Sequence, residues 1–513
     1  MARPGFVLEV DDRTPPLVVR SGDAFRLERF PVNTRVVYPA ESLPALPDLV
    51  EAITAALDEP VGSEPLSARL HAGMKLVVAY DDISTPLPRM RRPDIRGRIL
   101  EAVLSQAARA GVDDVTLVAA RGLNRRMSDA ELQHVVGERV FRSFFADGRL
   151  TSHDAEDADQ LTTVGTTEAG ETALNAAAVE ADLLVFVHVA AATGNGVCAV
   201  ARGLGSSATV SRLSAQPDTG KPVPEADQIE TQVAAACSIF QIEAVLDNSA
   251  YASPLSFLGR REWEWNVKDQ TAWLGVHRGL SVTSSKTRRR ILAAAPSSYA
   301  PIQITAGAPE AVAEASERAV LEQRLVEVNG QADVAIVGVG NSTPHSVASV
   351  TNPVLAAWSA LASTFRAHRG RPVVRAGGAL VVYHPMRPDF SPLHHPSSVD
   401  FFAEVLPATT DPVQIAEKFE AKFATDPWYA HLYRTGHAFH GVHPFLLWNE
   451  LAAARAHCGD IIFVGAHRPT VDRLGFRAAS TLADALEIVS STVGRSPAIT
   501  YLHTPDLLVT DVR

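Results

Sequence analysis

The sequence predicts a two-domain α/β protein in which each domain has a mostly parallel sheet flanked by helices. Short apolar, β-branched stretches alternate along the chain with alanine- and leucine-rich stretches of helical length. Continuous apolar strands separated by such helices are typical of βαβ units, whose sheets are covered on both faces. A chain of 513 residues is also too long for a single hydrophobic core.

In the first half of the chain, three apolar stretches are expected to form neighbouring buried strands. The predicted strands are "MKLVVAYDD" at 74–82, "DDVTLVAARG" at 113–122 and "ADLLVFVHV" at 181–189. A helix is expected over 93–111, where Gly111 would end it, because glycine commonly follows the last turn of a helix. Another helix is expected over 128–137, since it opens with a serine, a preferred N-cap residue.

The pattern becomes less regular over 293–310, and a second α/β series follows it. We therefore place the boundary near 290–330 and predict an N-terminal domain at 1–300 and a C-terminal domain at 301–513. The tryptophan-rich segment 261–276 is expected to lie between domains, with its aromatic rings used in packing. The second series has predicted strands at 332–341, 377–385, 459–467 and 498–505, and a predicted amphipathic helix at 481–494.

Composition restricts the class of protein. A formal charge of −11 without a basic patch or tail argues against nucleic-acid and anionic-membrane partners. The three cysteines are far apart, which fits a reducing compartment and excludes a disulfide framework. Neither a signal peptide nor a membrane-spanning stretch is found, so we expect a cytoplasmic protein with a small-molecule substrate. An oligomer or a protein partner remains open.

The loops that follow the three first-half strands carry the candidate binding groups. Ligands of α/β sheets bind beyond the carboxyl ends of the strands, so these loops are predicted to share one cleft. The glycines of the third loop would let backbone N–H groups approach a phosphate or carboxylate closely. The polar and glycine residues of the three loops are Asp82, Ser84 and Thr85, then Asn124, Arg125 and Arg126, then Gly194, Gly196, Gly203 and Gly205.

Most histidines lie in the second half of the chain. The spacing of His437, His440 and His443 could place two imidazoles on one helical face, and His394 or His395 could complete a metal site. Because no carboxylate accompanies them at a ligand spacing, structural or surface histidines are favoured over a metal site. His384 belongs to the same histidine-rich region.

Several segments, taken in order, resemble the nickel-pincer lactate racemase family, a two-domain α/β family of 2-hydroxyacid racemases and epimerases. "DDISTPLP" resembles the family's D-x-T-R-P-x-P, and "ARGLNRRMSDAEL" resembles its G-x-H-R-x-x-[ST]-x-x-E. "GNGVCAVARGLGSSATV" resembles S-G-G-x-K-x-x-x-P-G-x-x-S-x-x-T-I, and "GKPVPEADQIE" is similar to its G-N-P-V-H-E segment. In the second half, "VGVGNSTPH", "RAGGALVVYHP", "RTGHAF" and "DRLGFRAASTLADALEIV" keep the family's order.

The resemblance implies a nicotinate-derived nucleotide that holds nickel in a pincer and takes and returns a hydride. In the family, a lysine links to this cofactor, a histidine ligates the nickel, two histidines exchange the hydroxyl proton and an arginine holds the substrate carboxylate. The family's arginine matches Thr85, one histidine matches Asn124, the lysine matches Cys198 and the nickel-ligand histidine falls near Ser214. The second catalytic histidine matches either His188 or Thr193, depending on the anchor from which positions are counted.

These matches give the candidate site residues. The catalytic candidates are His188 and Asn124, the substrate-binding candidates are Thr85, Arg125 and Thr193, and the cofactor-binding candidates are Asp82, Ser84, Gly194, Gly196 and Cys198. No metal ligand is assigned. A small buried cysteine is the alternative interpretation of Cys198, and a structural histidine that of His188.

Three functions remain open at this point. The first is a racemase or epimerase of a hydroxy acid or sugar acid that uses a nickel-pincer-type nucleotide. The second is an enzyme that uses the same cleft without nickel. The third is a non-catalytic binding or complex-forming subunit, with the tryptophan-rich and histidine-rich segments as interaction surfaces.

Overall fold

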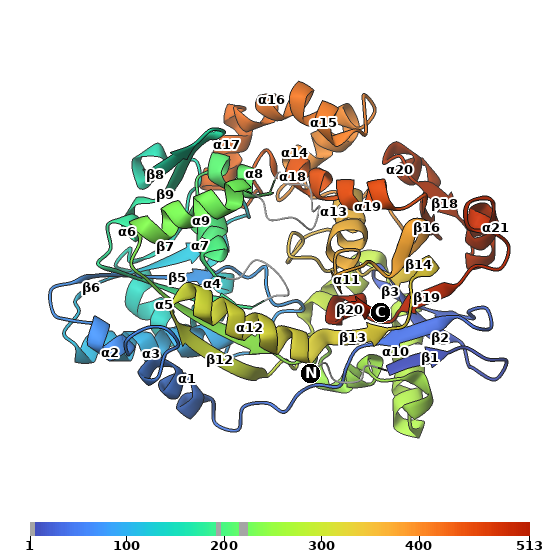
Figure 1. Ribbon diagram of the computed structural model, residues 1–513, viewed down its shortest axis with the longest axis horizontal. Coiled ribbons are helices and arrows are strands. Elements are labelled where there is room, and N and C mark those ends of the chain that lie inside the picture. The colour runs from blue at the N-terminus through green and yellow to red at the C-terminus, as the bar shows by residue number, and fades with distance from the viewer. Residues whose placement is uncertain (1–5, 191–195, 215–223) are drawn as a thin grey trace.

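The structure, a computed structural model, describes residues 6–190, 196–214 and 224–513. Figure 1 shows two lobes, with a six-stranded sheet on the left and a seven-stranded sheet on the right. Both sheets are mostly parallel and flanked by helices, which confirms the predicted α/β class.

The six-stranded sheet forms the core of the first lobe. Only its edge pair, β11–β12, is antiparallel among the described strands, and the other pairs are parallel. Its strand order is β12 (Pro301–Gly307), β11 (Ile239–Leu246), β10 (Leu183–Val189), β5 (Lys75–Asp81), β6 (Asp114–Ala120) and β7 (Leu150–Ser152).

Helices bury both faces of this sheet, which explains its continuous apolar strands. Leu76, Val78 and Tyr80 of β5 pack in one core with α3 (Ile95–Arg109) and α4 (Asp129–Val136). Val77 and Ala79 point the other way, toward α7 (Val197–Leu204) and α9 (Pro224–Ala236). Because successive side chains of β5 point to opposite faces of the sheet, this one strand contributes to the hydrophobic cores on both faces.

The predicted helix boundaries follow local signals. Gly111, with φ of 75°, follows the end of α3 in the left-handed region that glycine tolerates. Ser128 and Glu131 form a reciprocal capping box at the start of α4.

The seven-stranded sheet forms the core of the second lobe. α21 (Leu482–Val493) covers one face, while α13 (Pro353–Trp358) and α18 (His443–Glu450) contribute to the core on the other. Its strand order is β1 (Phe6–Glu9), β4 (Arg35–Tyr38), β19 (Ile499–Leu502), β14 (Ala332–Gly338), β16 (Val374–Tyr383), β17 (Asp460–Val464) and β18 (Arg477–Ala479).

The chain does not fill the two sheets in sequence order. β1 and β4, from the start of the chain, extend the sheet of the second lobe, where β4 pairs with β19. β12 begins at Pro301 yet is the edge strand of the first lobe. The division into domains at 1–300 and 301–513 stays a prediction. The two sheets do not follow this division, because β1 and β4 belong to the second sheet and β12 belongs to the first.

Smaller elements connect the lobes. The hairpin β2 (Leu17–Ser21) with β3 (Ala24–Glu28) packs against Trp265 and Trp273, which confirms that aromatic rings of the tryptophan-rich segment are used in packing. α17 (Pro427–Thr435) places Tyr433 in a core shared with Leu123 and Val210 of the first lobe. No described helix is long and apolar enough to cross a membrane.

One local prediction is wrong, and one possibility is not realised. The segment 293–310 is predicted to be irregular, but it contains β12 and the start of α12 (Pro309–Arg324). The spacing of His437, His440 and His443 could place two imidazoles on one helical face. Instead α17 ends at Thr435 and α18 begins at His443, with Gly436 and Gly441 in the loop between the two helices.

Candidate functional site

A cavity of about 780 Å³ lies between the lobes, at the carboxyl ends of both parallel sheets. The first-lobe wall includes residues 84–88 after β5, Asn124 after β6 and residues 189–190 at the end of β10. The second-lobe wall includes residues 342–345 after β14 and 504–509 after β19. All three predicted loop regions reach one space, so the predicted shared cleft is confirmed.

Asp82 joins the first two loops. Its Oδ1 accepts a hydrogen bond from the backbone N–H of Ser84 (2.8 Å), and its Oδ2 accepts one from Nδ2 of Asn124 (3.0 Å). Burial raises the pKa of Asp82, while the hydrogen bonds from Ser84 and Asn124 favour the carboxylate. Asp82 therefore orients Ser84 and Asn124, and these two residues line the cavity together with Thr85.

His188 pairs with Asp81 at the ends of the neighbouring strands β10 and β5. Nδ1 of His188 lies 2.9 Å from Oδ1 of Asp81, and Oδ2 of Asp81 accepts the backbone N–H of Val189 at 2.8 Å. The carboxylate thus favours the tautomer with hydrogen on Nδ1, which leaves Nε2 as the basic nitrogen. Glu243 of β11 is the register partner of His188 on the other side.

Arg125 does not line the cavity. Its guanidinium makes a bidentate ion pair with Glu131 (2.9 and 2.6 Å) and also donates to the backbone oxygen of Val347 (3.0 Å). These contacts hold the start of α4, and the predicted contact of Arg125 with substrate stays a prediction. Arg121, four residues earlier, does line the cavity and lies over the ring of Tyr433.

The third loop is described only in part. Thr193 and Gly194 lie outside the described residues, so their predicted roles stay predictions. The backbone N–H of Gly196 donates to the buried carboxylate of Glu243 (3.2 Å). Cys198 is partly buried in α7, burial raises the pKa of its thiol, and the thiol contacts Glu230.

Sequence reasoning missed most of the positive charge in the cavity. Arg121 and Arg202 lie within the quoted motif segments, but Arg20, Arg324 and Arg366 come from distant elements and no local motif marks them. Burial raises the pKa of Asp506 and of Glu450, the two acidic groups in the wall. The arginines in the wall are Arg20, Arg121, Arg202, Arg324 and Arg366.

These charges are only partly paired. Arg20 lies 3.5 Å from Asp506, and Arg366 lies 3.8 Å from Glu450, which also accepts the indole N–H of Trp358. Arg324, at the end of α12, has no ion-pair partner within the part of the chain that the structure describes. The cavity therefore carries an excess of positive charge suited to an anion.

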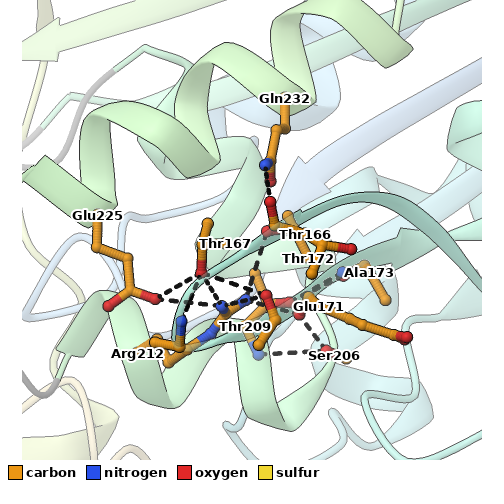
Figure 2. Close-up of polar contacts among 12 residues, drawn as sticks. Thr166, Thr167, Glu171, Thr172, Ala173, Ser206, Thr209, Arg212, Glu225 and Gln232 are labelled. Carbon is orange, nitrogen blue, oxygen red and sulfur yellow. Dashed lines mark hydrogen bonds and ion pairs between the residues drawn. The ribbon is translucent and has the colours of Figure 1, made fainter.

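A network around Arg212 positions the wall formed by α8 (Ser207–Ser214) (Figure 2). Arg212 donates to the hydroxyl of Thr167 (2.9 Å) and to the backbone oxygens of Gly170 (2.8 Å) and Glu171 (2.6 Å). It also pairs with Glu225 of α9 at 3.1 Å. Arg212 thereby ties α8 and α9 to the hairpin β8 (Leu161–Thr167) and β9 (Gly170–Asn175), and Ser214, at the end of α8, lines the cavity.

The second-half histidines do not converge on one point. Among the described residues, no group of three His, Cys, Asp or Glu side chains is placed to hold a metal ion. The possible metal site is therefore not formed. The partners of these histidines are Asn341 for His384 (2.8 Å), the His345 backbone oxygen for His395 (2.7 Å), the Arg126 backbone oxygen for His437 (3.1 Å), Glu156 for His440 (2.8 Å) and His345 for His443 (3.1 Å), while His394 packs beside His395.

Residues 23–214 match the family model of the lactate racemase N-terminal domain. This part of the chain is a lactate racemase-like domain. The whole lactate racemase-like fold is similar to that of the lactate racemase apoprotein from Thermoanaerobacterium thermosaccharolyticum, with a TM-score of 0.61, 17% identity, and coverage of 96% of this chain and 99% of that one. A Thermotoga maritima protein also matches, with a TM-score of 0.48, 13% identity, and coverage of 91% and 97%. None of the curated proteins matches.

The donor groups of this lactate racemase-like chain do not fit the nickel-pincer group. The resemblance matches the linking lysine with Cys198, which has no amine to form the link, and burial raises the pKa of its thiol. The resemblance places the nickel-ligand histidine near Ser214, whose hydroxyl is a poor nickel ligand compared with imidazole. Neither of these two matched side chains can supply the link or the fourth ligand of the family.

Proposed function

We propose that this lactate racemase-like protein is an isomerase that binds a hydroxy acid or sugar acid in the cavity between its lobes and acts without the nickel-pincer nucleotide. The observation that carries this proposal is the excess of arginine over carboxylate in that cavity. Arginine is the side chain best suited to a carboxylate, since its planar N–H groups can bind both oxygens.

The cavity wall offers separate groups for the two ends of such a molecule. Arg324, which has no ion-pair partner among the described residues, would bind the carboxylate. Ser84, Thr85 and Asn124 would bind hydroxyl groups, since each side chain can both donate and accept. A wall with this many hydroxyl and amide groups suits a substrate with several hydroxyls.

His188 would transfer the proton. It precedes the lining residues Val189 and Ala190 at the end of β10, and Asp81 orients the ring by holding its Nδ1 side. Cationic groups around a carboxylate stabilise the negative charge that develops when a base removes the hydrogen from the neighbouring carbon. A proton delivered by solvent to the opposite face would invert that carbon, and His188 would then release its own proton to solvent.

A non-catalytic anion-binding subunit is the second candidate. It is favoured by one observation, namely that Thr85, Asn124, Cys198 and Ser214 supply no group that titrates near neutral pH. Binding without turnover separates this candidate from the isomerase.

The test combines binding with hydrogen exchange. Calorimetry with lactate and gluconate should show that Arg324→Gln weakens binding about tenfold or more, because a charge-assisted contact is lost. Arg495→Gln, at an exposed arginine on the opposite edge of the sheet, should leave binding unchanged. In D₂O, NMR should show exchange of the substrate's α-hydrogen by the native protein and none by His188→Asn.

Failure of the native protein to bind any hydroxy acid would refute the proposal. Binding that depends on Arg324 without any exchange of the α-hydrogen would leave the binding subunit as the function.

A further inference from the structure

A second, smaller pocket of about 200 Å³ lies on the other side of the β2–β3 hairpin from the cavity. Residues along the hairpin divide between the two spaces. Arg20, Gly22 and Phe25 line the cavity, whereas Ser21, Asp23 and Arg26 line the small pocket. The hairpin packs closely against Pro385 at Gly22, because a Cβ added there would lie only 2.9 Å from Cδ of Pro385. The absence of a side chain at Gly22 keeps the wall between the two spaces thin.

The small pocket concentrates positive charge. Arg26 comes from β3, Arg288 and Arg289 from α11 (Ser285–Ala294), and Arg387 from the segment after β16. Four guanidinium groups face two carboxylates, Asp23 and Asp389, so two positive charges remain.

Both carboxylates have the same ion-pair partner, Arg289. Arg289 lies 3.9 Å from Asp23 and 3.7 Å from Asp389, which is too long for a hydrogen bond in either case. Arg26 and Arg387 have no ion-pair partner among the described residues, and the buried Nε atoms of Arg288 and Arg289 have no hydrogen-bond partner there. Buried donors of this kind normally have an acceptor.

A hydrogen-bonded chain holds the floor of the pocket rigid. The backbone N–H of Met386 donates to Nδ1 of His384 (3.1 Å), and Nε2 of His384 donates to Oδ1 of Asn341 (2.8 Å). Asn341 in turn contacts Asp23 through its side chain. Burial lowers the pKa of His384 to about 3, so this histidine is neutral and fixes the orientation of the Asn341 amide.

We propose that this pocket is a second ligand site, which binds a compact oxyanion, such as a phosphate or carboxylate group, through Arg26, Arg288 and Arg387. The pocket is large enough for a small oxyanion and its bound waters. Its two excess charges favour a dianion over a monoanion. Free phosphate and a phosphate group on a larger molecule share this chemistry, and the open side next to exposed Arg387 admits either.

The variants that test the site avoid structural side chains. Arg26 and Arg387 make no ion pair with any described residue and can be replaced together, as Arg26→Gln with Arg387→Gln. Arg288 is kept, because it holds the end of α10 (Val267–Val282) through the backbone oxygens of Leu280 and Thr283. The matched control is Arg371→Gln with Arg495→Gln. These exposed arginines precede β16 and β19, at the opposite edge of the same sheet.

The measurement is equilibrium dialysis of the full-length protein with labelled inorganic phosphate, with sulfate and acetate as competitors, at constant ionic strength. Loss of two charge-assisted contacts should weaken phosphate binding about tenfold or more in the double variant and leave the control unchanged. Asp389→Asn should tighten binding, because it removes a negative charge at the site, and this gain cannot result from unfolding. Sulfate should compete better than acetate, and a sugar phosphate that competes like free phosphate would identify an esterified ligand.

Phosphate binding that is equal in the native protein and the Arg26/Arg387 variant would overturn the proposal. The same holds if Arg324→Gln abolishes all phosphate binding, since the anion would then occupy only the cavity between the lobes.

Discussion

The polar groups at the carboxyl edge of the first sheet are largely paired with one another, whereas the walls of both pockets also carry arginines without ion-pair partners among the described residues. At that edge, Asp81 holds His188, Asp82 holds Asn124, and Glu131 holds Arg125. By contrast, Arg324, at the end of α12, lines the cavity and Arg387 lines the small pocket without such a partner in the described part of the chain.

This difference separates two kinds of residue that look alike in the sequence. A paired group stabilises and orients its loop, because removing one partner leaves the other buried and unsatisfied. An unpaired cation on a cavity wall contributes little to the fold and is available to a ligand. Replacing a paired group should therefore lower the stability of the fold and change ligand binding little. Replacing an unpaired arginine should weaken ligand binding and change stability little.

The largest effect is expected at the buried pair Arg125–Glu131. Arg125→Met should lower the free energy of unfolding by about 3–5 kcal/mol, because it leaves the carboxylate of Glu131 buried without its cation. Denaturant unfolding measures this change, and Arg126→Met at the exposed neighbour is the control. Lactate binding by the folded variant should be unchanged, and a lost affinity with unaltered stability would place Arg125 in the binding site after all.

A smaller effect is expected from pH. Burial raises the pKa of Glu450, so this carboxyl takes up a proton as the pH falls and the cavity becomes more positive. His345 stays neutral, since burial lowers its pKa to about 4. Lactate affinity should therefore rise between neutral pH and about pH 5, where lactate is still ionised.

Calorimetry across this range checks the pH effect. The variant Glu450→Gln should bind lactate with an affinity that changes less with pH than that of the native protein. A native affinity that is lower at pH 5 than at neutral pH would contradict the assignment of Glu450 to the cavity wall.

The smallest effect is expected at Cys198. Cys198→Ser should change the free energy of unfolding by about 1 kcal/mol or less, as is usual for a partly exposed position. Its thiol should react slowly with a disulfide reagent at neutral pH, because burial raises its pKa. Cys237 and Cys458, with pKa values raised to about 11 and 12, are internal references. Fast labelling of Cys198 would point to a reactive thiolate.

The arrangement of the first lobe could be predicted because its signals are local. The strands at 74–82, 113–122 and 181–189 and the capping box at Ser128 depend on neighbouring residues, and the βαβ pattern then brings Ser84, Thr85 and Asn124 to one edge. Addition of β1 and β4 to the second sheet could not be predicted, since it depends on pairing with a strand at the other end of the chain.

The same reason explains the functional residues that were missed. Arg20, Arg324 and Arg366 meet only in the folded protein, and their local sequence resembles that of any surface helix or hairpin. Arg125 was assigned to substrate because it belongs to a motif, but its partner Glu131, six residues on, occupies its guanidinium. Whether an arginine is paired is decided by tertiary contacts.

The nickel content of the purified protein tests the central claim, namely that this lactate racemase-like chain binds its anionic ligand without the family's nickel centre. The protein is expressed in a host that makes the pincer nucleotide, and nickel per chain is measured by mass spectrometry together with lactate binding on the same sample. We predict lactate binding that depends on Arg324 in protein without stoichiometric nickel. Stoichiometric nickel in the native protein, lost in Cys198→Ala, would contradict this account and make Cys198 an anchor for the cofactor.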